Sequence, residues 1–244
     1  MRVMIIGATS GIGLALAEHY AARGAHVAVC GRDPGWLDGH ALASAPQVRR
    51  YGFDIADRAA LRSAMQEFGA EGLDLLIVTA GQYADAAGLA ARPESGLELV
   101  QTNIMGLAQA FDEAAVLMRR QRRGHLVAVA SIAGLLKEYP AGSLYSASKR
   151  AAIAVCDAWR KALAPFGIAV TAIVPGYVDT ARLRELNGGD ARGKPFLQSE
   201  ADAVRRMAAA IERREARCVF PWQLHVMVRL FNLLPRGFQN LRRK

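Results

Sequence analysis

The sequence predicts an α/β fold in which a parallel, doubly wound sheet of about seven strands carries helices on both faces, giving three layers. Three observations lead to this prediction. Short apolar runs alternate with longer segments of helical spacing. The intervals between the runs are long enough for the crossover helices that parallel strands require. The chain of 244 residues is 52% hydrophobic, so it can bury a sheet on both faces.

The strands and helices follow from these patterns in chain order. The opening apolar run at residues 3–6 is typical of a buried parallel strand, and the helix expected at residues 12–23 ends at Gly24. Further strands are expected at residues 25–30, 48–53, 73–79, 125–131 and 168–174, and further helices at residues 96–120 and 144–165. Residues 182–198 interrupt the alternation with three glycines and a proline, which favours a mobile lid beside the strand ends where ligands bind.

Composition excludes several classes of protein. The hydrophobic content and a charged fraction of 22% exclude a disordered chain. Cys30, Cys156 and Cys218 stand far apart, which excludes a disulfide scaffold and a cysteine zinc site, so we expect no metal and a reducing, cytoplasmic location. No apolar run is long enough to span a membrane. Three glycines and a Thr-Ser pair within residues 3–17 speak against a signal peptide.

The net charge of +9 belongs to the C-terminal part of the chain. Residues 203–244 hold ten basic and two acidic residues, whereas residues 1–202 hold 21 and 20. A nearly neutral body argues against a nucleic-acid-binding protein. Beyond residue 220, bulky apolar residues such as Val226 and Leu230 precede a basic end. This extension fits either an amphipathic element on an anionic membrane or a helix packed on the subunit's own core or a partner.

A glycine-rich turn lies between the first strand and the first helix. Gly7, Gly11 and Gly13 follow a G-x3-G-x-G spacing. Such glycines allow a tight turn and a close approach of a pyrophosphate to the N–H groups at a helix N-terminus. A turn without a ligand is the alternative, but its place directly after the first strand favours a dinucleotide. The expected contacts are Gly7, Thr9, Ser10, Gly11, Ile12 and Gly13.

Ser131, Tyr145 and Lys149 form a candidate acid–base site. Tyr145 and Lys149 are four residues apart and share a helix face. A free tyrosine has a pKa near 10, and a neighbouring cation lowers that pKa. Ser131 follows a strand and could hydrogen-bond a substrate oxygen, which favours an alcohol–carbonyl interconversion. A Tyr-x3-Lys pair alone also arises by chance on helix surfaces.

Taken together, these motifs resemble the short-chain dehydrogenase/reductase family over about residues 1–220. Its catalytic segment Tyr-Ser-Ala-Ser-Lys stands at residues 145–149, its catalytic Asn at Asn103, and its Pro-Gly segment at residues 175–180. The resemblance implies a Rossmann-like catalytic domain over residues 1–220, an extension over residues 221–244, a small-molecule substrate, and a homodimer or homotetramer. Two departures are Ile6, where the family usually has Thr, and Thr79, where it has Asn.

The resemblance also implies a role for each site residue. Tyr145 is the acid–base, Lys149 binds the nicotinamide ribose and lowers the Tyr145 pKa, Ser131 orients the carbonyl, and Asn103 distorts its helix and holds a water. The further cofactor contacts that it implies are Asp54, Ile55, Ala80, Gly81, Pro175, Gly176, Val178 and Thr180. Among these, Asp54 and Ile55 would flank the adenine, and Val178 and Thr180 would contact the nicotinamide amide.

The end of the second strand favours NADP over NAD. Gly31 stands where an NAD-preferring relative would carry an acid, and Arg32 can form a fork onto a 2′-phosphate. The alternative is a solvated Arg32 neutralised by Asp33. We therefore expect an NADP(H)-dependent oxidoreductase that interconverts a carbonyl and a secondary alcohol, acting as a reductase. The alternatives are an NAD-preferring dehydrogenase, a membrane-peripheral lipid-carbonyl reductase, and a non-catalytic nucleotide-binding module, which would have lost Ser131, Tyr145 or Lys149.

Overall fold

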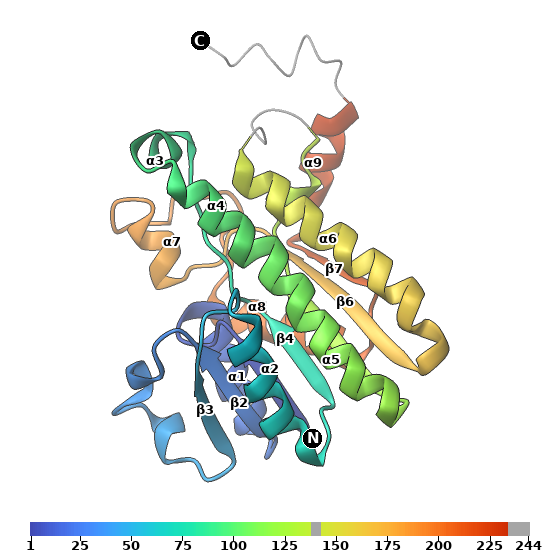
Figure 1. Ribbon diagram of the computed structural model, residues 1–244. Helices are drawn as coiled ribbons and strands as arrows, with labels where there is room; N and C mark the ends of the chain where they lie inside the picture. The colour runs from blue at the N-terminus through green and yellow to red at the C-terminus, as the bar shows by residue number, and fades with distance from the viewer. Residues whose placement is uncertain (138–142, 234–244) are drawn as a thin grey trace.

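A computed structural model of the chain describes residues 1–137 and 143–233, and these residues build a single seven-stranded parallel sheet (Figure 1). Its strands lie in the order β3-β2-β1-β4-β5-β6-β7. The strands are β1 (Arg2–Ile6), β2 (His26–Gly31), β3 (Val48–Gly52), β4 (Leu75–Val78), β5 (Gly124–Val129), β6 (Ile168–Pro175) and β7 (Arg217–Phe220). The predicted α/β class with a doubly wound parallel sheet is thus confirmed.

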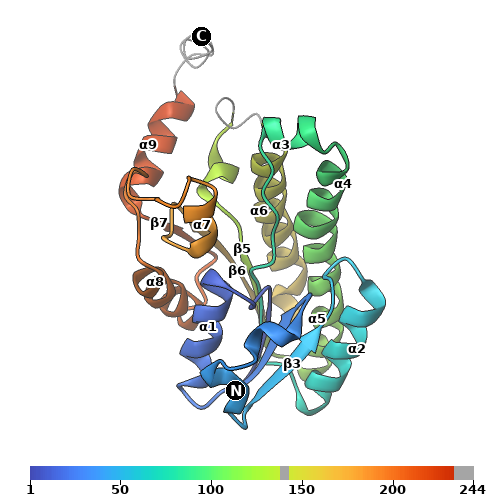
Figure 2. The ribbon, with the colours of Figure 1, turned by 90° about the vertical axis from the view of Figure 1, so that its left-hand side faces the viewer.

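Helices cover both faces of the sheet, which gives three layers (Figure 2). The helices α1 (Gly11–Ala21) and α8 (Glu200–Glu212) cover one face, and α2 (Arg58–Phe68), α5 (Leu107–Gln121) and α6 (Leu144–Leu163) cover the other. Alternate strand residues divide between the two cores. In β1, Val3 and Ile5 pack with α1 and α8, whereas Met4 and Ile6 pack with α2 and α5. This division explains why the strands appear as continuous apolar runs in the sequence.

The prediction of one continuous α-helix at residues 96–120 is wrong, because the observed helical segment is irregular. It consists of α4 (Glu94–Val100), a π-helical segment (Gln101–Gly106) and α5, with the short helix α3 (Ala86–Ala91) before it. A π-helical turn inserts an extra residue into the hydrogen-bond ladder and is often found at functional sites. Gly106 allows this segment to pack closely, because a Cβ there would lie 2.7 Å from Cγ2 of Ile55.

The chain after β6 contains more regular secondary structure than the sequence indicated. Within residues 182–198, most of α7 (Ala181–Glu185) forms, and Val178 pairs with Gln198 in an isolated parallel bridge. Two elements that were not predicted follow, α8 and β7. The last described element is α9 (Trp222–Leu233), which starts where β7 ends and projects from that end of the molecule (Figure 1). None of the helices in the described part of the chain is long and apolar enough to cross a membrane.

The strand order places a switch point between β1 and β4. From β1 the chain continues to β2 and β3 on one side, and from β4 it continues to β5, β6 and β7 on the other. In open α/β sheets, ligands bind outside the carboxyl ends of the strands at such a point. The candidate residues after β1, β4, β5 and β6 therefore converge at one edge.

Candidate active site

The glycine turn after β1 is packed so tightly that two of its positions exclude any side chain. A Cβ on Gly13 would lie 2.2 Å from the carbonyl oxygen of Gly7, and a Cβ on Gly7 would lie 2.4 Å from the backbone nitrogen of Ala80. Gly7 and Gly11 also have φ angles of +92° and +50°, in the left-handed region that favours glycine. The turn thus brings the start of α1 against the loops after β1 and β4.

The N-terminus of α1 fits a dinucleotide pyrophosphate. Ser10 is the N-cap residue, but its side chain makes no capping hydrogen bond to the described part of the helix. The first N–H groups of a helix have no intrahelical partner, and the positive end of the helix dipole favours an anion there. Free donors beside a glycine cradle are what a bound pyrophosphate requires.

Thr79 holds this cradle to the neighbouring strand. Its hydroxyl lies 3.0 Å from the carbonyl oxygen of Ile6 and 2.9 Å from that of Gly7, and donates to them. The backbone N–H groups of Thr79 and Ala80 both donate to Ile6 as well. Thr79 thus makes the hydrogen bonds that join β4 to the turn after β1. It does so at a position where the family that the sequence resembles usually has Asn.

Tyr145 and Ser131 meet beside the carboxyl end of β5. Ser131 lies two residues past the last residue of β5, and Tyr145 is in the first turn of α6, which Ser143 caps through the N–H of Ser146. Burial raises the pKa of Tyr145, while a hydrogen bond with Ser131 acts in the opposite direction. In the protein without cofactor, Tyr145 thus carries its proton at neutral pH.

Lys149 is buried one helical turn after Tyr145. Its Nζ donates to the carbonyl oxygen of Val129 at 3.2 Å and lies 5.7 Å from the centroid of the Tyr145 ring. Burial lowers the pKa of Lys149 to about 8. Gly81 leaves the space in front of the ammonium group free, because a Cβ there would lie 3.1 Å from Nζ. Lys149 is thus directed from α6 toward the loop after β4.

Asn103 lies in the π-helical segment and joins three elements. Its side-chain oxygen accepts from the N–H of Gln82 at 2.7 Å, and its amide group donates to the carbonyl oxygen of Gln82 at 3.0 Å and to Oγ of Ser148 at 2.9 Å. The side chain is only 3% exposed. Asn103 therefore fixes the loop after β4 and the helix α6 in place, so that Lys149 and Gly81 face each other.

Two tyrosines that the sequence did not single out complete the site. The ring of Tyr83 packs edge-on against that of Tyr145, with 5.0 Å between centroids, and Tyr177 is also near Tyr145. Nζ of Lys194, from the segment after β6, lies 5.5 Å from the centroid of the Tyr177 ring. Tyr83 comes two residues after Gly81, which is a weak signal in a single sequence. The ring of Tyr83 thus covers part of the Tyr145 ring with aromatic surface.

The glycine turn packs against the end of β2, next to Arg32. A Cβ on Gly31 would lie 2.1 Å from Cγ2 of Thr9, so the glycine turn packs directly on the end of β2. Arg32 is exposed, and it takes part in none of the ion pairs of the described residues. Asp33 accepts a hydrogen bond from the N–H of Gly35 instead. Across the sheet edge, Asp54 is exposed and Ile55 is buried.

The segment after β6 lies beside the start of α1. Pro175 is the last residue of β6, and a Cβ on Gly176 would lie 2.8 Å from Cδ2 of Leu224 in α9. Val178 is buried, and Thr180 caps α7 by accepting from the N–H of Leu183. The Thr180 methyl carbon lies 3.4 Å from where a Cβ of Gly11 would be. The structure thus brings the Gly turn and the Pro-Gly segment together.

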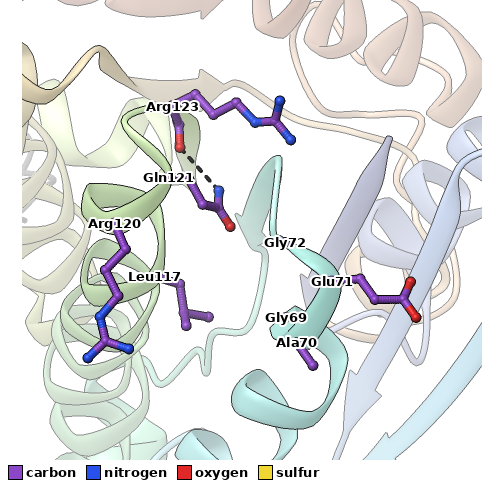
Figure 3. A pocket seen from close by; sticks show the side chains of 8 residues that line it. All are labelled: Gly69, Ala70, Glu71, Gly72, Leu117, Arg120, Gln121 and Arg123. Carbon is purple, nitrogen blue, oxygen red and sulfur yellow. Dashed lines mark hydrogen bonds between the residues drawn. The ribbon is translucent and has the colours of Figure 1, made fainter.

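A surface hollow lies at the opposite end of the sheet and belongs to a different region (Figure 3). It is lined by Gly69, Ala70, Glu71, Gly72, Leu117, Arg120, Gln121 and Arg123. These residues precede β4 and β5 and so lie at the amino ends of the strands. The Gln121 side chain is hydrogen-bonded there to the backbone. Its oxygen accepts from the N–H of Leu73, and its amide group donates to the carbonyl oxygens of Leu73 and Arg123. The hollow contributes nothing to the candidate site.

Comparisons with known proteins found similar sequences. The sequence model of the family described as "short chain dehydrogenase" matches residues 1–191. An uncharacterized oxidoreductase of Myxococcus xanthus is 32% identical over 237 residues, which are 95% of this chain and 92% of that protein.

Solved structures share the fold. A short-chain dehydrogenase from Sphingobium yanoikuyae in complex with NADPH superposes with a TM-score of 0.81 at 25% identity, covering 97% of this chain and 96% of its own. A 3-oxoacyl-[acyl-carrier protein] reductase with bound NAD from Brucella melitensis superposes with a TM-score of 0.75 at 24% identity. The match covers 90% of this chain and 88% of that structure's chain.

Proposed function

Because the chain belongs to the short-chain dehydrogenase/reductase family and is an NAD(P)-dependent oxidoreductase, we propose that it reduces a carbonyl group to a secondary alcohol with NADPH. The observation that carries the proposal is the convergence of Ser131, Tyr145 and Lys149 at the strand edge that also holds the glycine turn. The nicotinamide, when bound, supplies the hydride, and the residues of the chain align the substrate and handle the proton.

Tyr145 is the proposed proton donor to the substrate oxygen. Burial keeps the pKa of Tyr145 above its usual value, so the phenol is protonated at neutral pH, as an acid in the reductive direction must be. Ser131, hydrogen-bonded to Tyr145, would hold the carbonyl oxygen next to the phenol. The edge-on contact with Tyr83 would limit the access of water to one side of the Tyr145 ring and would favour one orientation of that ring.

Lys149 and Asn103 have separate proposed roles. Lys149 would bind the nicotinamide ribose hydroxyls, with Gly81 leaving room for them, and its positive charge would stabilise the phenolate left after proton transfer. Asn103 positions Gly81 and α6 through its three hydrogen bonds, and the water relay is proposed to start from its segment. The remaining proposed cofactor contacts are Thr9, Ser10, Ile12, Asp54, Ile55, Ala80, Pro175, Gly176, Val178 and Thr180.

The preference for NADPH is proposed on Arg32. An exposed guanidinium without an ion-pair partner among the described residues is available to a 2′-phosphate, and Asp33 is occupied by the N–H of Gly35. The NADPH complex of the Sphingobium relative supports this choice. We further propose residues 1–220 as the catalytic domain, a homodimer or homotetramer, and a cytoplasmic location, which the three free cysteines support.

Arg32→Ala is expected to weaken NADPH binding by about 10- to 100-fold, because a charge-assisted hydrogen bond contributes about 1.5–3 kcal/mol. NADH carries no 2′-phosphate, so its affinity is expected to stay unchanged. Titrating the purified protein with each nucleotide and following nicotinamide fluorescence measures both. Arg120→Ala, at the opposite end of the sheet, is the matched control and should bind NADPH normally. Equal affinity of the wild type for NADH and NADPH would overturn the NADPH preference.

A further inference from the structure

The helix α9 has two apolar faces, of which the described part of the chain covers one. Leu224 and Val228 are buried against the core. Asn232 ties the same side of the helix to the turn after Ser131, because it donates to the carbonyl oxygen of Leu135 at 2.8 Å and accepts from the N–H of Lys137 at 3.0 Å. The helix is therefore held firmly in place.

The opposite face of α9 is apolar and exposed. It consists of Trp222, Val226, Met227, Leu230 and Leu233, and is called here the outer face. Trp222 is 68% exposed, Leu230 is 60% exposed and Leu233 is 79% exposed. Most of these residues recur at intervals of three or four, so they share one side of the helix. A contiguous patch of large, exposed apolar side chains marks a surface that a membrane or another molecule covers.

The charge of the sequence that carries the outer face indicates the chemistry of what covers it. No acidic residue follows Glu215 in the sequence, whereas six arginines and lysines do. Arg229 is exposed on α9 itself, and the eleven residues after Leu233 carry four basic residues. Bulky apolar residues flanked only by positive charge are typical of helices that lie at an anionic membrane surface. Tryptophan, here at the start of the helix, favours the membrane–water interface.

A second copy of the chain is a poorer occupant. Pairing two outer faces would bring together two segments whose charged residues are all positive, which costs electrostatic energy. Five side chains on one helix are also far fewer than the 20–30 residues that each partner contributes to a stable interface. We propose that the outer face of α9 docks this protein on an anionic lipid surface. This inference rests on α9 alone and does not require the proposed reaction.

Flotation with lipid vesicles tests the docking. The full chain is expected to bind vesicles of phosphatidylcholine mixed with phosphatidylglycerol, to bind pure phosphatidylcholine more weakly, and to release as salt is added. Val226→Ser combined with Leu230→Ser should reduce binding to the mixed vesicles about tenfold or more, because apolar area is lost from the outer face. Brominated lipids should quench the fluorescence of Trp222. The Trp222→Phe variant lacks this fluorescence and so shows which part of the quenching comes from Trp222.

The matched control replaces two exposed apolar residues elsewhere. Leu97→Ser combined with Val116→Ser, on α4 and α5, should leave vesicle binding unchanged. NADPH titration of both double variants verifies that each is folded, and separates a failure of docking from a failure of the proposed reaction. Equal flotation of the two double variants, or no flotation of the wild type, would overturn the proposal. So would a dimer in light scattering that only the α9 variant dissociates, since the outer face would then be covered by a second copy.

Discussion

Replacing Tyr145 with Phe is expected to lower kcat by about 10²–10⁴-fold, the range over which general acid–base catalysis contributes. The variant keeps the ring that packs against Tyr83 and loses only the hydroxyl that Ser131 contacts. NADPH binding should therefore stay within a few-fold of the wild type. Kinetics with a panel of ketones and aldehydes measures the first effect, and nucleotide fluorescence measures the second.

Tyr83→Phe is the matched control for this experiment. Tyr83 is in ring contact with Tyr145, so the substitution removes a hydroxyl from the same aromatic cluster without removing the proposed acid. Its kcat should fall far less than that of Tyr145→Phe. Comparable losses in the two variants would mean that the cluster acts as a binding surface and that Tyr145 is not the proton donor.

Gly13→Ala is expected to destabilise the protein by about 1–3 kcal/mol, the usual cost of overpacking. Its Cβ would lie 2.2 Å from the carbonyl oxygen of Gly7 and 2.6 Å from Oγ1 of Thr79. Neither atom can retreat without breaking the hydrogen bonds that join the turn to β4. The displaced helix terminus should also bind NADPH at least about 100-fold more weakly, if about two charge-assisted hydrogen bonds are lost.

Urea unfolding and nucleotide titration measure these two effects of Gly13→Ala. Gly193→Ala is the control, because a Cβ at Gly193 meets no atom within 4 Å and should change neither quantity. An unfolding free energy and an NADPH affinity at the wild-type level in Gly13→Ala would contradict the close packing of the turn and its role as the pyrophosphate cradle.

The sheet and its order of elements follow from sequence because the signals are local and strong. Buried parallel strands form continuous apolar runs, and glycines such as Gly7 and Gly31 mark the points where they end. Ser131, Tyr145 and Lys149 were candidates for one site because Tyr145 and Lys149 share a helix face and Ser131 follows a strand. Their combination with the glycine turn and Asn103 is what resembles a known family. The apolar pattern therefore predicted the fold class, and the resemblance to a family predicted most of the site residues.

The missed features depend on tertiary contacts that no single segment encodes. The π-helical segment coincides with long-range contacts, since Asn103 binds Gln82 and Ser148, and Gly106 packs on Ile55. The strand β7 has only four residues, and it is recognisable mainly through its pairing with β6. Tyr83 reaches Tyr145 from a different loop, which a sequence spacing of 62 residues does not indicate. The sequence alone does not show which apolar residues of α9 pack on the core and which form the outer face, because both sets are apolar.

The most direct test of the proposed reaction is the transfer of deuterium from NADPH deuterated at nicotinamide C4. Carbonyl compounds are incubated with the wild type and with Tyr145→Phe, and the alcohols are analysed by mass spectrometry and NMR. The proposed reaction predicts deuterium on the carbinol carbon with the wild type and almost none with Tyr145→Phe, although both bind NADPH. Equal transfer by the two proteins would contradict it, as would a wild type that binds NADPH tightly and transfers no deuterium to any carbonyl of the panel.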